Sequence, residues 1–164
     1  MPLTVGTKAP DFTLPTKTID GPKRITLSEN FEKQNTLLAF FPMAFTSTCT
    51  TEMCEVSAGL NAYTSLNASV YGISGDNPFA QEAWAQKEKI TVPLLSDYEH
   101  KVAQEYGVMY DSFLPQMNLG MSGVPKRSAF IIDRNGVIQY AESNDDARQL
   151  PNFEKIKEKL AELK

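Results

Sequence analysis

Two cysteines near the middle of the chain are the residues best suited to chemistry. Cys49 follows a hydroxyl-rich stretch that includes Ser47 and Thr48, and Cys54 comes five positions later. Ser47 and Thr48 are of the types that cap helices. The following residues include four at the spacing of one helical face: Met53, Val56, Leu60 and Tyr63. Cys49 is therefore predicted in the first turn of a helix, where unpaired N–H groups and the helix dipole favour the nucleophilic thiolate.

A buried strand is predicted immediately before this helix. Residues Thr36 to Phe41 form a short apolar segment that Pro42 ends, too short for an independent helix. A strand, a loop and a helix start therefore bring the first cysteine into place.

The loop and helix start carry a family resemblance. Pro42, Thr46 and Cys49 reproduce the Pro-x-x-x-Thr-x-x-Cys signature of peroxiredoxins, with Glu52 three residues further on as in many members. The position of Cys54 resembles the PrxQ or bacterioferritin-comigratory branch, whose resolving cysteine stands there. Three further stretches resemble the same family: Ala9 to Pro15, Val92 to Asp97 and Tyr106 to Val108.

The resemblance implies a thiol-dependent peroxidase for hydrogen peroxide or organic hydroperoxides that needs no metal or organic cofactor. Cys49 would attack the peroxide and become a sulfenic acid. Arg127, which immediately precedes an apolar strand, matches the arginine that the family aims at this cysteine. Arg127, the Thr46 hydroxyl and the Cys49 backbone N–H would stabilise the leaving oxygen, Pro42 would shield the thiolate, and Glu52 would orient Arg127 and Thr46.

By the same resemblance, Cys54 would resolve the sulfenic acid as an intramolecular disulfide that thioredoxin or a similar dithiol reduces. Five helical residues rise about 7.5 Å, whereas a disulfide needs Cα atoms within about 7 Å, so the helix must unwind. In the alternative, Cys54 is a small buried apolar residue and an external thiol resolves Cys49, as in one-cysteine enzymes.

Other functions of two cysteines fit the spacing less well. A thioredoxin-like disulfide oxidoreductase expects C-x-x-C, and a copper-delivery module of the same fold pairs C-x-x-x-C with a distal histidine. Structural zinc usually takes four Cys or His ligands, but His100 is the only histidine and is expected to be a solvated surface residue. A redox-sensing or binding role is an open addition to peroxidase chemistry.

Composition narrows the class of protein. The chain has 164 residues, 41% of them hydrophobic, and is expected to form one domain over residues 1–164. Its formal net charge is -4 with both signs mixed along the chain, so nucleic acid and anionic membranes are not expected partners. The absence of a signal peptide favours the cytoplasm. The expected oligomeric state is a monomer or a homodimer.

The remaining pattern predicts an α/β protein with a thioredoxin-like fold, in which helices flank a mixed central sheet. A strand at residues 69–74 follows the cysteine helix and makes a parallel pair. Asn77 caps the next helix, with Phe79, Ala83 and Trp84 facing inward. The turn at residues 133–136 joins a terminal hairpin, which adds antiparallel strands, and an amphipathic helix closes the chain.

One long loop is predicted at residues 110–124, which have no clear periodicity. Loops of this length are often functional. Three methionines in or beside it are expected to fill gaps in the core, with a dimer contact as the alternative: Met109, Met117 and Met121.

Overall fold

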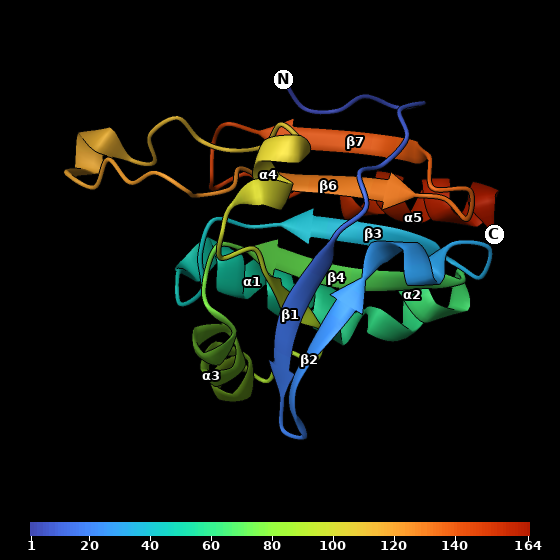
Figure 1. Cartoon of the computed structure of the whole chain (residues 1–164), viewed down its shortest axis with the longest axis horizontal. Coiled ribbons are helices and arrows are strands. Elements are labelled where there is room, and N and C mark those ends of the chain that lie inside the picture. Colours follow the sequence, from blue (N-terminus) through green and yellow to red (C-terminus); the bar gives the residue numbers. More distant parts are fainter.

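The computed structural model describes all residues, 1–164, and is built around a five-stranded mixed sheet in the order β5-β4-β3-β6-β7 (Figure 1). Its strands are β3 (Asn35–Phe40), β4 (Ala68–Ser74), β5 (Leu94–Ser96), β6 (Arg127–Ile132) and β7 (Ile138–Asn144). β4 runs parallel to β3 and β5, whereas β6 runs antiparallel to β3 and β7. The predicted mixed α/β sheet is confirmed.

Helices and an N-terminal hairpin cover the sheet. The helices are α1 (Ser47–Ala58), α2 (Leu60–Ser65), α3 (Pro78–Glu88), α4 (Lys101–Glu105) and α5 (Phe153–Leu163), with 3-10 turns η1 (Leu27–Asn30) and η2 (Pro115–Met117). The hairpin consists of β1 (Thr13–Thr18) and β2 (Gly21–Thr26), which form a separate two-stranded sheet. One core contains side chains of α1, α2, α3 and α5, and the other contains side chains of α4 and the N-terminal segment. No helix in this structure has the length and apolar character that a membrane span requires.

The period of two along β6 decides which face its side chains reach. Ala129 and Ile131 belong to the core that α1 covers, whereas Phe130 and Ile132 belong to the core on the opposite face. Arg127 has the same parity as Ala129 and Ile131, so the pleat directs it toward the cysteine helix. Strand register thus brings together two residues that are distant in the sequence.

The boundaries of two helices correct the sequence analysis. Thr46 is the N-cap residue of α1, and Ser47 already lies within the helix, because the backbone leaves its extended conformation one residue earlier than predicted. On α3, Phe79 is 67% exposed and Ala83 is exposed as well, whereas the buried side chains are Gln81 and Trp84. The inward face of α3 is therefore rotated from the one expected, since a polar residue, Gln81, lies on it.

The predicted loop at residues 110–124 extends from the body of the molecule (Figure 1, orange, left). Isolated bridges join Met109 to Pro125 at its base and Phe113 to Met121 further out. Met117 and Met121 are 63% and 40% exposed. The prediction that they fill core gaps is wrong, because the loop leaves the core before it reaches them.

Candidate active site

The loop between β3 and α1 is held in shape by two hydrogen bonds. The backbone N–H of Ala44 donates to Asp76 Oδ2 at 2.8 Å, and the Thr46 hydroxyl donates to the carbonyl of Met43 at 2.8 Å. Pro42 is buried at the start of this loop. The segment therefore enters α1 in a defined conformation.

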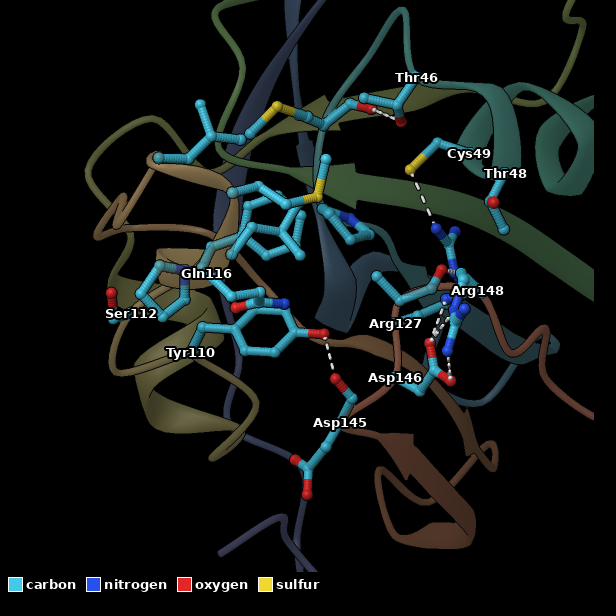
Figure 2. A pocket seen from close by; sticks show the side chains of 18 of the residues that line it. Thr46, Thr48, Cys49, Tyr110, Ser112, Gln116, Arg127, Asp145, Asp146 and Arg148 are labelled. Atoms are coloured by element: carbon cyan, nitrogen blue, oxygen red, sulfur yellow. Dashed lines mark hydrogen bonds and ion pairs between the residues drawn. The ribbon is translucent and has the colours of Figure 1, made fainter.

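Cys49 lies in the first turn of α1, as the sequence predicts, and is only 1% exposed. Its Sγ accepts a hydrogen bond from Nη2 of Arg127 at 3.2 Å (Figure 2). A guanidinium at this distance favours the ionised, nucleophilic form of a thiol. Cys49 thus has two features expected of a reactive cysteine, a position at a helix start and a neighbouring guanidinium.

Three acceptors fix the guanidinium of Arg127. Besides Cys49, Nη1 donates to Glu52 Oε1 at 2.9 Å, and Nε donates to the backbone carbonyl of Ala147 at 2.9 Å. Burial opposes the charge of Arg127, but the neighbouring Glu52 and Cys49 outweigh it and raise the arginine pKa above its ordinary value. The cation is therefore maintained although the side chain is almost fully enclosed.

Glu52 is the buried partner of this arginine and has no exposed surface. Burial raises the pKa of its carboxyl to about 7, against the lowering effect of Arg127. Oε2 has no hydrogen-bond partner. Because a carboxylate in such surroundings is costly, the charge of Glu52 changes close to neutral pH.

A cavity of about 650 Å³ opens above the thiol. Its walls come from the β3–α1 loop, the long loop at 110–119, β6 and the segment at 145–148 (Figure 2). Pro42, Thr46, Cys49 and Arg127 all line it, while Glu52 contacts Arg127 from behind. The structure thus brings five of the six predicted site residues together.

Cys54 is the exception. It is half-buried, and its Sγ donates to the carbonyl of Glu88 on α3 at 3.6 Å. Five positions on a helix correspond to a rotation of about 140°, so the two free thiols point to different sides of α1. Burial, followed by the charge of Glu88, raises the pKa of the Cys54 thiol.

His100 differs from its expected surface position. It is half-buried at the N-cap of α4, and its Nδ1 is buried without a hydrogen-bond partner. The structure contains no group of three His, Cys, Asp or Glu side chains that could hold a metal ion.

The segment at residues 145–148 is part of the site but was not recognised from the sequence. It supplies the Ala147 carbonyl to Arg127 and the outer wall of the cavity. One signal was available: an aspartate two residues before a turn N–H, here Asp146 before Arg148, is typical of an Asx-turn. Tyr110, from the opposite wall, was also not recognised as a site residue.

Comparison with known proteins gives consistent results. A family model described as AhpC/TSA family matches residues 5–141. Alkyl hydroperoxide reductase E of Mycobacterium tuberculosis is 34% identical over 142 residues, which are 85% of this chain and 85% of that protein. Chloroplastic peroxiredoxin Q of Triticum aestivum is 35% identical over 139 residues, covering 85% of this chain and 58% of that protein.

Solved structures show the same likeness. Reduced 2-Cys peroxiredoxin of Plasmodium vivax superposes with a TM-score of 0.84 at 26% identity, covering 97% of this chain and 81% of the other. Peroxidoxin BcpB from Mycobacterium tuberculosis has a TM-score of 0.83 at 27% identity, covering 99% of each chain.

Proposed function

This chain belongs to the AhpC/TSA family and is a thiol-dependent peroxidase, and on that premise we propose how its individual residues act. Cys49 is the nucleophile. Its thiolate attacks one oxygen of the peroxide, the O–O bond breaks, and the sulfur becomes a sulfenic acid. The leaving oxygen takes a proton from solvent and departs as water or an alcohol. Sulfur loses the two electrons that the peroxide gains.

The contact between Arg127 and Cys49 is the observation that carries this proposal. The guanidinium can stay beside the sulfur and extend toward the leaving oxygen, where negative charge develops. The Cys49 backbone N–H would complete the set of donors, joined by the Thr46 hydroxyl once it turns from the carbonyl of Met43. Pro42 would shield the thiolate, and Glu52 would hold Arg127 in place. Donors of this kind contribute about 2.7–4 kcal/mol each in other enzymes.

The cavity supports an organic hydroperoxide as substrate in addition to hydrogen peroxide. Its volume of about 650 Å³ greatly exceeds the space of a molecule about the size of two waters, roughly 60 Å³. Apolar side chains of the long loop, including Phe113 and Leu114, form part of its wall. The name of one relative, alkyl hydroperoxide reductase E, points to the same substrate class.

Cys54 completes the proposed cycle. Its thiol displaces the hydroxyl of the Cys49 sulfenic acid, which gives a disulfide and water, and a dithiol such as thioredoxin then reduces the disulfide. Because the two thiols point to different sides of α1, this step requires the helix to unwind around them. Recycling by a dithiol fits a reducing compartment such as the cytoplasm, in a monomer or a homodimer.

The first test is a single turnover of reduced protein with one equivalent of hydrogen peroxide, followed by intact mass and a free-thiol count. Rapid loss of both thiols, with a mass lower by two hydrogens, is the expected result. Gain of one oxygen with Cys54 still free would instead mean resolution by an external thiol. A rate no faster than that of free cysteine would contradict the peroxidase assignment.

A second test concerns Cys54 alone. Cys54→Ser is expected to lose steady-state turnover with thioredoxin, because the sulfenic acid then has no internal thiol to attack it. Turnover as fast as that of the unaltered protein would exclude the resolving role.

A further inference from the structure

The least expected contact of Arg127 is the one made by its Nε. The side chain is 2% exposed, and a guanidinium carries five N–H donors in a planar fork with fixed directions. Nη1 and Nη2 reach Glu52 and Cys49, and Nε reaches the carbonyl of Ala147 at 2.9 Å. Since Ala147 lies in a turn outside the sheet, something must hold that turn against the arginine.

Asp146 builds the turn from within. Its Oδ1 accepts the backbone N–H of Arg148 at 2.9 Å, and its carbonyl accepts the N–H of Gln149 at 3.0 Å. The guanidinium of Arg148 also pairs with both carboxylate oxygens, at 3.0 and 3.1 Å (Figure 2). Hydrogen bonds from Arg148 hold the pKa of Asp146 below its ordinary value, so this carboxylate stays ionised throughout the neutral range.

Tyr110 holds the turn from the opposite wall of the cavity. Its hydroxyl donates to the carbonyl of Asp145 at 2.7 Å (Figure 2). Lys126 lies beside both residues, with its Nζ 5.9 Å from the centre of the tyrosine ring and 2.8 Å from Asp145 Oδ1. The turn is therefore stabilised from within by Asp146 and held from the opposite wall at Asp145.

We propose that residues 145–149 are a positioning element for Arg127, in which Asp146 and Tyr110 keep the carbonyl of Ala147 against Nε. With three acceptors on three sides, the planar guanidinium has one orientation, and Nη2 faces the sulfur of Cys49. When the carbonyl moves away, the guanidinium can rotate about its remaining contacts, and Nη2 leaves the sulfur. The inference rests on the proposed role of Arg127 and adds residues that do not touch the reacting atoms.

The test compares two substitutions of Asp146, because the Ala147 carbonyl itself cannot be exchanged. Asp146→Ala removes the acceptor that forms the turn, whereas Asp146→Asn keeps an oxygen for the Arg148 N–H. Asp20→Ala is the matched control, since Asp20 lies in an exposed turn outside the cavity. Thermal unfolding checks that each variant folds.

Two quantities are measured for each variant. The first is the second-order rate of Cys49 oxidation by hydrogen peroxide in a single turnover. The second is the ratio of Cys49 to Cys54 alkylation by iodoacetamide at neutral pH, measured by peptide mass, which needs no peroxidase activity. Asp146→Ala is expected to react with peroxide roughly tenfold to a hundredfold more slowly and to show a lower alkylation ratio. Asp20→Ala is expected to stay within about twofold of the unaltered protein on both measures, and Asp146→Asn is expected to recover most of the loss seen in Asp146→Ala.

Two results would overturn the proposal. One is an Asp146→Ala variant within twofold of the unaltered protein on both measures. The other is an equal loss in Asp146→Ala and Asp146→Asn, which would make the charge and not the turn responsible. If Asp146→Ala does not fold, Tyr110→Phe decides, because it removes only the hydroxyl that reaches Asp145 and should shift alkylation in the same direction. If the unaltered protein does not react with hydrogen peroxide, the peroxidase assignment is contradicted. The alkylation measurement would still test whether the turn positions Arg127 beside Cys49.

Discussion

Cys49 and Cys54 lie on the same helix, five positions apart, and their surroundings differ in nearly every respect. Cys49 is 1% exposed, lines the cavity and accepts a hydrogen bond from a guanidinium at 3.2 Å. Cys54 is more exposed, lies outside the cavity and donates to a backbone carbonyl at 3.6 Å. A carbonyl favours the protonated thiol, whereas a guanidinium favours the thiolate. The difference teaches that charge and hydrogen-bond direction, and not exposure, distinguish the two thiols.

Replacing Arg127 by lysine should have the largest effect on this difference. Lysine keeps the charge but loses the planar fork that reaches Cys49, Glu52 and Ala147 together. We expect the rate of Cys49 with hydrogen peroxide to fall by roughly 10²–10³. We also expect the preference of iodoacetamide for Cys49 over Cys54 at neutral pH to disappear, as measured by peptide mass.

The matched control for that exchange is Arg24→Lys on the exposed face of β2, which should leave both cysteines unchanged. If Arg127→Lys kept its peroxide rate within threefold of the unaltered protein, the guanidinium geometry would not distinguish the two thiols.

Glu52 provides the next prediction, because the Cys49 site has a buried carboxyl behind its arginine. Its pKa is about 7 in the folded protein, raised by burial from the 4.5 of a solvent-exposed carboxyl, so the folded state binds more protons than the unfolded state between these values. Its contribution to stability is therefore full below pH 4.5 and is lost as the pH rises through 7. We expect the free energy of unfolding to fall by on the order of 3 kcal/mol over this range, relative to Glu52→Gln.

Urea unfolding at several pH values measures this effect. Glu158→Gln is the control, since Glu158 lies exposed on α5 and is not among the charges that shift the pKa of Glu52. Parallel pH profiles for Glu52→Gln and the unaltered protein would show that the buried carboxyl does not titrate in this range.

The smallest expected effect is that of replacing Trp84, which contacts the part of α1 between the two cysteines. Its indole N–H donates to the Thr50 hydroxyl at 3.0 Å, which attaches the first turn of α1 to α3. Trp84→Phe should lower the free energy of unfolding by about 1 kcal/mol and, since α1 must unwind, speed disulfide formation about fivefold. Tyr98→Phe, at an exposed position, is the control. A slower disulfide step in Trp84→Phe would mean that α1 does not need to open there.

Much of the fold and of the reactive centre could be predicted because local sequence encodes it. The helix period placed Cys49 in a first turn, the strand period placed Arg127 at a strand start, and the burial of Trp84 follows from its type. Each of these depends on a few neighbouring residues. The mixed sheet followed from the order of strands and helices and from the turn at 133–136.

The sequence predictions that the structure contradicts, and the contact that they did not include, have a different origin. Phe79 was expected inside because of its residue type, yet the buried face of α3 accommodates Gln81, whose amide donates to Ser74 and to the carbonyl of Leu95. The contact to Arg127 from Ala147 uses a backbone carbonyl, which every residue type possesses, so the sequence carries no sign of it. Packing between distant segments decided both cases.

The bridge between Met109 and Pro125 has a consequence for how the protein can change during evolution. Because the chain is already closed at that bridge, the 13 residues from Asp111 to Gly123 can lengthen, shorten or be exchanged at little cost in loop entropy. This loop forms one wall of the cavity above the Cys49 thiol, whereas Cys49 belongs to α1 and Arg127 to β6. Related chains can therefore diversify in the molecules they accept while the sulfur chemistry is inherited intact.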